Sequence, residues 1–258
     1  MLVNILAVGD IVGKSGLDCL ERRLPSMIKM KGIHFTVVNG ENAAVLGITP
    51  DMAEAIFDAG ADVITLGNHT WAKKEIISYM EESPNIIRPL NFAPQSPGRG
   101  WTLVERDFGT VLVANLIGRC SMDFGPDNPF LAADTLLAEQ KAAVTLVDFH
   151  AEATSEKLAM GYYLDGRVSA VWGTHTHVQT SDAQVLPQGT GYVTDLGMTG
   201  PARSVLGIKP EQSINMFLGN PRERFEAAPG ACKLECAVFT IDTETGKTRE
   251  VEVLRIHD

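Results

Sequence analysis

The chain has 258 residues, of which 45% are hydrophobic and 21% charged, and its formal net charge is −10 at pH 7. This length and composition exclude wholesale disorder and predict one folded domain over residues 1–258, because a chain of this size can bury a large apolar core. Proteins that hold long nucleic acids use basic surfaces. The acidic balance therefore argues against strong binding to long nucleic acid.

The N-terminal run and the cysteines bear on where the protein is found. No apolar run approaches the length of a membrane span, and the run Leu2–Val8 lacks the basic start of a signal peptide. The cysteines stand at positions 19, 120, 232 and 236 without Cys-x-x-Cys spacing, which is typical of reduced thiols. We therefore expect a cytoplasmic protein without membrane contact. The sequence leaves open whether identical copies form a homo-oligomer.

Apolar runs alternate with helical patterns along the first part of the chain. The expected elements are a strand over Val3–Val8, a helix over about 16–31, a strand over His34–Val38, a helix that begins at Pro50, a strand over Val63–Leu66 and a helix over about 73–81. Thr49 is the expected N-cap of the second helix, and Gly60 marks its end. Pro25 interrupts the first helix.

Hairpin patterns appear later in the chain. The expected elements are strands over Trp101–Arg106 and Thr110–Leu116, a helix from Asn128-Pro129 to about 140, a strand over Val144–Phe149, a helix near 154–161, and strands over Val168–Trp172, Cys232–Asp242 and Thr248–Ile256. Ser121–Phe130 is expected as a loop, either over a pocket or simply connecting. Strand–helix units followed by hairpins predict two packed sheets with helices outside, an α/β layered sandwich.

Polar residues that can bind metals follow directly after five of these strands. The segments are Gly9-Asp10, Asn39-Gly40-Glu41-Asn42, Gly67-Asn68-His69, Phe149-His150 and Gly173-Thr174-His175-Thr176-His177. In open α/β sheets, ligands bind beyond the carboxyl ends of the strands, so these side chains would meet in one crevice. Four of the six histidines lie in these segments, whereas His34 and His257 are expected as surface residues.

The donor set favours two metal ions. Imidazole, carboxylate and amide donors together suit Mn, Fe, Zn or Co. Seven donors exceed the three or four protein ligands of an ordinary zinc site, but they suffice for two ions about 3.5–4 Å apart that share a carboxylate. The seven candidate ligands are Asp10, Glu41, Asn42, Asn68, His150, His175 and His177. His175 and His177, two apart in a segment expected to be extended, would point the same way and reach different ions.

One segment suggests a different function. The run Gly9-Asp10-Ile11-Val12-Gly13-Lys14-Ser15 resembles the phosphate-binding loop of NTPases, but three residues separate its glycines where that loop has four. Asp10 would also place a carboxylate in an anion site. A P-loop-like NTPase is therefore a remote alternative.

Taken as an ordered set, the metal-binding segments resemble the calcineurin-like metallophosphoesterases, and in particular their bacterial YmdB-like branch, which is similar to phosphodiesterases acting on cyclic nucleotides. The resemblance spans nearly the whole chain. It includes Arg88-Pro-Leu-Asn91, Asp127-Asn-Pro-Phe130, the run from Asp148 to Lys157 and Gly197-Met-Thr-Gly-Pro201.

The chain departs from the wider superfamily at three positions. The superfamily motifs read Asp-x-His, Gly-Asp and Gly-Asn-His-Asp/Glu, whereas this sequence has Val12 for the first histidine, Glu41 for the bridging aspartate and Thr70 for the final acid. These departures match the YmdB-like branch. Loss of a histidine makes one metal position richer in oxygen, which leaves the identity of the metal open.

The resemblance implies a four-layer αββα sandwich, metallophosphoesterase-like, with two divalent or transition metal ions per chain. Fe or Mn is expected, with Zn or Co as alternatives. The implied ligands of one ion are Asp10, Glu41, Asn42 and His177, and those of the other are Glu41, Asn68, His150 and His175. Glu41 would bridge. Asn42 could instead hold its loop by hydrogen bonds.

These features predict a dimetal phosphodiesterase that hydrolyses small phosphodiesters through a metal-bridging hydroxide. The expected substrates are 2′,3′-cyclic nucleotides, with 3′,5′-cyclic nucleotides as the alternative. His69 follows Asn68 directly and is predicted to be the general acid, since an imidazole exchanges protons near neutral pH; it could instead only form hydrogen bonds to the metal site. The rival function is a regulatory protein that binds metal or nucleotide with little turnover.

Overall fold

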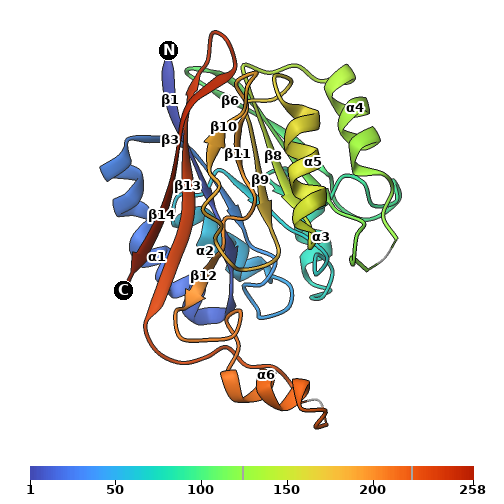
Figure 1. The fold of residues 1–258 in the computed structure, drawn as a ribbon, viewed down its shortest axis with the longest axis vertical. Helices are drawn as coiled ribbons and strands as arrows, with labels where there is room; N and C mark the ends of the chain where they lie inside the picture. Colours follow the sequence, from blue (N-terminus) through green and yellow to red (C-terminus); the bar gives the residue numbers. More distant parts are fainter. Residues whose placement is uncertain (124, 222) are drawn as a thin grey trace.

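The computed structural model describes residues 1–123, 125–221 and 223–258, which form fourteen strands and six helices (Figure 1). Phe124, in the expected loop Ser121–Phe130, lies outside the described residues. No helix among the described residues is both long enough and apolar enough to cross a membrane.

The larger sheet has eight strands in the described part of the chain. They are β1 (Leu2–Val8), β2 (Asp10–Ile11), β3 (Ile33–Asn39), β4 (Val63–Thr65), β5 (Ile86–Ile87), β12 (Met198–Pro201), β13 (Cys232–Asp242) and β14 (Lys247–His257). Their order is β2-β12-β13-β1-β3-β4-β5, and β14 pairs with β13. Because β1, β3 and β4 are parallel neighbours, their carboxyl ends meet at one edge.

The smaller sheet has six strands among the described residues. They are β6 (Trp101–Arg106), β7 (Gly109–Ile117), β8 (Val144–His150), β9 (Ala170–Thr174), β10 (Gln184–Val185) and β11 (Gly191–Val193). Their order is β10-β11-β9-β8-β7-β6. Strands β7, β8 and β9 are parallel, so this sheet also brings its carboxyl ends to one edge.

Six helices accompany the sheets in the described part of the chain, and all except α6 complete the four layers. They are α1 (Gly13–Lys31), α2 (Pro50–Asp58), α3 (Ile76–Glu82), α4 (Pro129–Glu139), α5 (Thr154–Leu164) and α6 (Pro210–Phe217). In Figure 1, α1 lies on one side of the molecule and α4 and α5 lie on the other.

Three buried hydrophobic clusters fill the spaces between the layers. In β1, Leu6 packs with Leu20 of α1, whereas Ile5, on the opposite face, packs with Trp172 of the other sheet. A third cluster, which includes Met160 of α5, joins the smaller sheet to α4 and α5. Side chains alternate across a strand, so each sheet buries both of its faces. The expected four-layer αββα sandwich is confirmed.

The long elements and the short strand β4 agree with the sequence, whereas most of the other short elements were not expected. The side chains of Thr49 and Asn128 cap α2 and α4 as expected, but the helix expected over 73–81 begins only at Ile76. Strands β2, β5, β10, β11 and β12 and helix α6 were not expected. Each of these strands has only two to four residues, too few to show periodicity, and tertiary pairing creates them.

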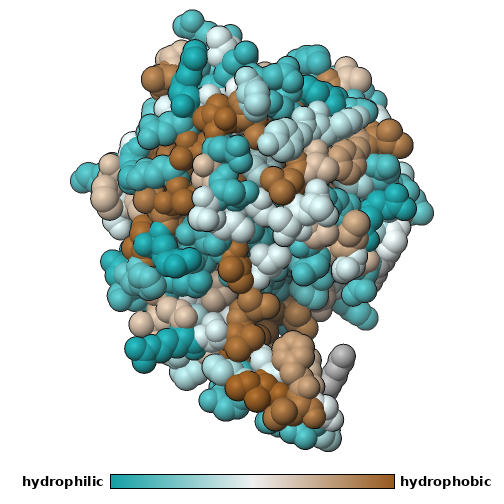
Figure 2. Space-filling model, in the orientation of Figure 1, coloured by the Kyte–Doolittle hydropathy of each residue, from teal (hydrophilic) through white to brown (hydrophobic). Residues whose placement is uncertain are grey.

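Helix α6 lies apart from the four layers at the lower end of Figure 1. Ile214, Phe217 and the following Leu218 are exposed, with Phe217 81% exposed. Figure 2 shows the hydrophobic surface over this helix. Its apolar side chains therefore contribute to the surface instead of the core.

Gly9 marks the closest backbone approach next to β2. The Asp10 N–H donates to the Gly197 carbonyl over 3.2 Å, and β2 runs parallel to β12. A Cβ on Gly9 would overlap the Gly197 carbonyl oxygen and would lie 2.7 Å from its carbon. A side chain at position 9 must therefore push β12 away from Asp10.

We expect Gly9→Ala to lower the free energy of unfolding by about 2–3 kcal/mol, because the backbone must shift to remove the overlap. Gly32→Ala is the control, since Gly32 has φ 55° and open space around it and should lose about 1 kcal/mol from backbone strain alone. Urea unfolding of both variants measures the difference. Equal losses would show that the close approach at Gly9 relaxes freely.

Candidate metal centre

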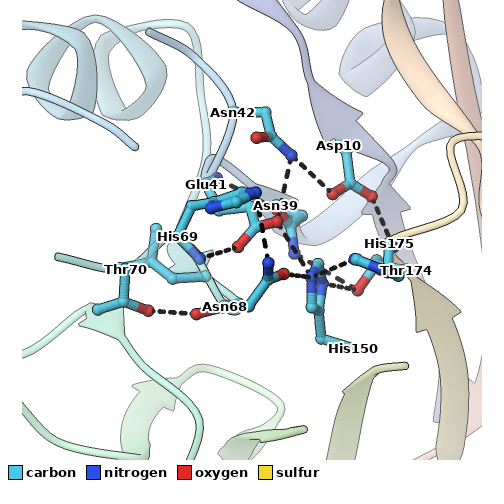
Figure 3. Close-up of polar contacts among 12 residues, drawn as sticks. Asp10, Asn39, Glu41, Asn42, Asn68, His69, Thr70, His150, Thr174 and His175 are labelled. Atoms are coloured by element: carbon cyan, nitrogen blue, oxygen red, sulfur yellow. Dashed lines mark hydrogen bonds and ion pairs between the residues drawn. The ribbon is translucent and has the colours of Figure 1, made fainter. Parts of the chain in front are cut away.

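The carboxyl ends of strands from the two sheets lie side by side, and the structure brings all seven candidate ligands together there. Figure 3 labels these residues except His177. Asp10 follows β1, Glu41 and Asn42 follow β3, Asn68 follows β4, His150 ends β8, and His175 and His177 follow β9. Both sheets therefore contribute donors to one cluster. The side chains separate into two groups of contacts.

The first group surrounds the Nε2 atom of His150. Oε1 of Glu41 lies 3.0 Å from it, Oδ1 of Asn68 lies 3.0 Å from it, and Nδ1 of His175 lies 3.1 Å from it. Ligand atoms of Glu41, His150 and His175 all lie within 4.8 Å of one another, which suits a shared metal ion. Asn68 already turns its amide oxygen toward this group.

The second group surrounds the side-chain amide of Asn42. Its Nδ2 lies 3.1 Å from Oε1 of Glu41, 3.5 Å from Oδ1 of Asp10 and 3.2 Å from Nε2 of His177. Nε2 of His177 also lies 3.6 Å from Oδ1 of Asp10. The same Glu41 oxygen thus takes part in both groups. The Asn42 amide nitrogen faces the cluster and acts as a hydrogen-bond donor. Rotation of the amide by 180° would turn its oxygen toward the cluster instead.

The cluster fits metal ions in spacing and in charge. Two ligands at right angles on an ion, each bonded over about 2.1 Å, lie about 3 Å apart, which is close to the separations in both groups. The carboxylates of Asp10 and Glu41 are fully buried. Among the described residues, no lysine or arginine forms an ion pair with either of them, so only the neighbouring histidines or a bound cation can balance these two buried charges.

Gly67 leaves the space in which the first group forms. A Cβ on Gly67 would overlap Nε2 of His150 and Oε2 of Glu41. Any larger residue there would occupy the position of the donor atoms. The lack of space beside the cluster, and not the backbone conformation of a turn, therefore explains why a glycine stands at position 67.

His150 is oriented by a hydroxyl on its other ring nitrogen. Nδ1 lies 2.9 Å from Oγ1 of Thr174, and this hydroxyl donates to Oδ1 of Asp148 over 2.7 Å. Asp148 is fully buried and also accepts from Thr65. Burial raises the pKa of Asp148 to about 6, although the Thr65 hydrogen bond opposes the shift. This series of hydrogen bonds directs Nε2 of His150 toward the cluster. Histidines that bind metals are commonly oriented in this way through their other ring nitrogen.

The other two histidines are oriented in the same way. Nδ1 of His177 donates to the Leu206 carbonyl over 3.0 Å, which leaves Nε2 for the cluster. Nε2 of His175 lies 3.3 Å from a Glu152 carboxylate oxygen, which leaves Nδ1. Thr174, Asp148, Glu152 and Leu206 were missed from the sequence. The available signals were the position of Thr174 immediately before His175 and the resemblance of the run from Asp148 to Lys157, which contains Asp148 and Glu152.

The segment that carries His175 and His177 is not extended as expected. His175 has φ 98° and His177 has φ 62°, both in the left-handed region that side chains rarely adopt. The side chains nevertheless reach different groups, His175 the first and His177 the second. Local contacts must hold this backbone, because the sequence alone favours the extended form.

Burial and charge separate the proton affinities of these two histidines. Burial lowers the pKa of His175 to about 3, and the nearby His150 adds to the shift. Burial also acts to lower the pKa of His177, but the hydrogen bond and charge of Asp10 outweigh it and raise this pKa to about 9. His175 is therefore a neutral donor, whereas a cation near His177 must displace a proton.

His69 lies beside the cluster with its ring outside both groups. Its backbone N–H donates to Oε2 of Glu41 over 3.1 Å, and its Nε2 lies 3.3 Å from Nδ2 of Asn68. The residue is partly exposed. His69 therefore lies next to the candidate ligands, and its role as general acid stays a prediction.

The loop that resembles a P-loop contributes only Asp10 to the cluster. Lys14 is exposed at the start of α1, and its ammonium forms an ion pair with Asp18 over 2.5 Å. Its charge is therefore already matched one helical turn away.

Known proteins match this chain over almost its full length. The family of YmdB-like proteins matches residues 6–254. The chain belongs to the YmdB-like family. The 2′,3′-cyclic-nucleotide 2′-phosphodiesterase of Bacillus subtilis strain 168 is 46% identical, over 99% of this chain and 98% of its own.

Two solved structures share the fold of this YmdB-like chain. A hypothetical protein from Thermus thermophilus is 39% identical with a TM-score of 0.93, over 99% of this chain and 100% of its own. A phosphatase from Mycoplasma pneumoniae is 33% identical with a TM-score of 0.94, over 100% of this chain and 94% of its own. The expected family and the expected metallophosphoesterase-like fold are confirmed.

Two of the three residues at which this sequence departs from the wider superfamily, Val12 and Thr70, lie where they add no donor, whereas the third, Glu41, takes part in both groups. The Thr70 hydroxyl donates to the Gly67 carbonyl over 2.7 Å and does not reach either group. Val12 is buried against Gly207, since a Cβ added to Gly207 would lie only 3.0 Å from the Cβ of Val12. The candidate ligands in this YmdB-like chain therefore remain the seven predicted from the sequence.

We expect Thr174→Val to weaken Mn²⁺ binding about 10–100-fold, because it removes the hydroxyl that orients His150 and keeps a similar shape. Thr174→Ser should bind like the wild type. Thr190→Val is the matched control, since its buried hydroxyl bonds the Leu164 and Val168 carbonyls. Titration of metal-free protein with Mn²⁺ measures the effect, and wild-type affinity in Thr174→Val would contradict this role.

Proposed function

We propose that this protein is a metal-dependent phosphodiesterase that hydrolyses small phosphodiesters. The expected substrates are 2′,3′-cyclic nucleotides, with 3′,5′-cyclic nucleotides as the alternative. The observation that carries the proposal is the buried Glu41 oxygen shared by two groups of donors, because two-metal sites are a common means of phosphoester hydrolysis. The relative from Bacillus subtilis, named as a 2′,3′-cyclic-nucleotide 2′-phosphodiesterase, supports the substrate class.

The two groups of donors would each hold one metal ion. Glu41, Asn68, His150 and His175 would hold the first, and Asp10, Glu41, Asn42 and His177 would hold the second. Mixed nitrogen and oxygen donors favour Fe or Mn, with Zn or Co as alternatives. When bound, the two ions supply an activated water for attack on phosphorus and positive charge for the phosphoryl oxygens.

His69 is the residue that we assign to proton transfer. Hydrolysis breaks the bond between phosphorus and the leaving oxygen, and that oxygen needs a proton when it belongs to a ribose. Nδ1 of His69 has no hydrogen-bond partner among the described residues, so it is available to a ligand. A ring held beside Asn68 at the edge of the cluster can donate that proton without occupying a metal position.

A substrate panel tests the proposed function directly. Purified protein reconstituted with Mn²⁺ should hydrolyse bis-p-nitrophenyl phosphate and 2′,3′-cyclic nucleotides, and metal removal should abolish both activities. Lys14→Ala is the control variant and should retain wild-type rates, because Lys14 already pairs with Asp18. A collapse of activity in Lys14→Ala would favour the NTPase alternative. Metal or nucleotide binding without turnover on any divalent ion would favour the regulatory protein.

We expect His69→Ala to keep its metals and lose activity selectively. Removal of a general acid typically lowers the rate by about 10²–10⁴-fold. The loss should be large for 2′,3′-cyclic nucleotides, whose leaving alkoxide needs a proton, and small for bis-p-nitrophenyl phosphate, whose leaving phenolate does not. Measurement of kcat on both substrates, with metal content in parallel, decides this. Equal losses on both substrates, or loss of metal, would assign His69 to positioning or ligation.

A further inference from the structure

A buried ion pair lies next to the segment that carries His175 and His177, and it belongs to neither group of donors. Lys157 of α5 and Asp195, just after β11, are each 1% exposed, and Nζ lies 2.6 Å from Oδ2. Burial of two charges is costly unless further hydrogen bonds satisfy them. The other contacts of Asp195 therefore indicate what this pair stabilises.

The carboxylate of Asp195 binds the segment that carries His175 and His177, and it also binds Gly197, which pairs with the backbone of Asp10. Its Oδ2 accepts from the backbone N–H of Thr176 over 3.2 Å and from its hydroxyl over 2.7 Å. Its Oδ1 accepts from the Gly197 N–H over 2.8 Å. Thr176 stands between His175 and His177 in the sequence, and the Gly197 carbonyl accepts from the Asp10 N–H. One carboxylate thus contacts the immediate neighbours of three candidate ligands.

The backbone on either side of Thr176 needs such support. His175 and His177 both have positive φ, at 98° and 62°. Such conformations cost about 1–3 kcal/mol per residue and persist only where surrounding contacts impose them. The two hydrogen bonds to Thr176 act at the midpoint of this strained segment, so they hold both histidine backbones.

Lys157 places its ammonium directly against the Asp195 carboxylate that accepts these bonds. Burial raises the pKa of Asp195, and the charge of Lys157 opposes that shift. The lysine stem also packs against the strand that leads to His175, because a Cβ on Gly173 would lie 2.8 Å from Cδ of Lys157. The aliphatic stem of Lys157 therefore packs against the strand, and its charge pairs with Asp195.

We propose that the Lys157–Asp195 pair is a positioning device that sets His175, His177 and Asp10 for metal binding. The inference rests on the proposed metal-dependent function and deepens it. The pair touches neither donor group directly and acts through Thr176 and Gly197. Its loss should therefore weaken metal binding in a protein that still folds.

The test compares Mn²⁺ binding by metal-free wild type and Lys157→Met, with thermal unfolding measured in parallel. We expect Lys157→Met to bind Mn²⁺ about 10–100-fold more weakly, and saturating Mn²⁺ should restore most of its kcat. Asp165→Asn is the matched control. Its buried carboxylate accepts from the Gln188 and Thr190 N–H groups near the end of α5, so this variant should lose stability and keep wild-type Mn²⁺ affinity.

Thr176→Val serves where Lys157→Met does not fold, since it removes only the hydroxyl bond to Asp195. It should weaken Mn²⁺ binding by a smaller factor, and Thr176→Ser should restore it. Wild-type Mn²⁺ affinity in a folded Lys157→Met, or in Thr176→Val, would overturn the proposal. Failure of the wild type itself to bind Mn²⁺ would instead contradict the proposed function, so the two failures are distinguishable.

Discussion

The carboxylate of Glu41 lies fully buried between two clusters of donors, 3.0 Å from His150 and 3.1 Å from Asn42 through one oxygen. Its other oxygen accepts the His69 N–H. A buried charge of this kind is stable only with compensating cations or donors. Its neighbours are histidines and amides, and no lysine or arginine among the described residues pairs with it. The surrounding side chains and the glycine at 67 are arranged around this one group.

The four-layer architecture makes that arrangement possible. Glu41 follows a strand of the larger sheet, whereas His150 ends a strand of the smaller one, and the two meet only because the sheets pack face to face. Close backbone approach completes the geometry at Gly9 against Gly197. The fold thus contributes proximity, while contacts of the second ring nitrogen with Thr174, Leu206 and Glu152 set the direction of each imidazole.

The donors were readable from the sequence because each follows an apolar strand directly. Glu41 and His150 stand beyond such strands, and parallel strands bring their carboxyl ends to the same edge. The orienting residues were not readable, because the function of Thr174 depends on a contact with His150 across two strands. Lys157 appeared only as the end of a motif on a helix. Short strands such as β12 were missed because pairing with Asp10 and its neighbour, and not periodicity, creates them.

The central claim is that one Glu41 carboxylate joins two metal positions. Electron paramagnetic resonance of protein loaded with Mn²⁺ tests it most directly, because two ions bridged by a carboxylate interact magnetically. We predict uptake of two equivalents per chain with an exchange-coupled spectrum, and loss of the coupling in Glu41→Ala but not in Lys14→Ala. If the protein reached full activity with one equivalent of Mn²⁺ per chain and gave the spectrum of an isolated Mn²⁺ ion, the account would be contradicted.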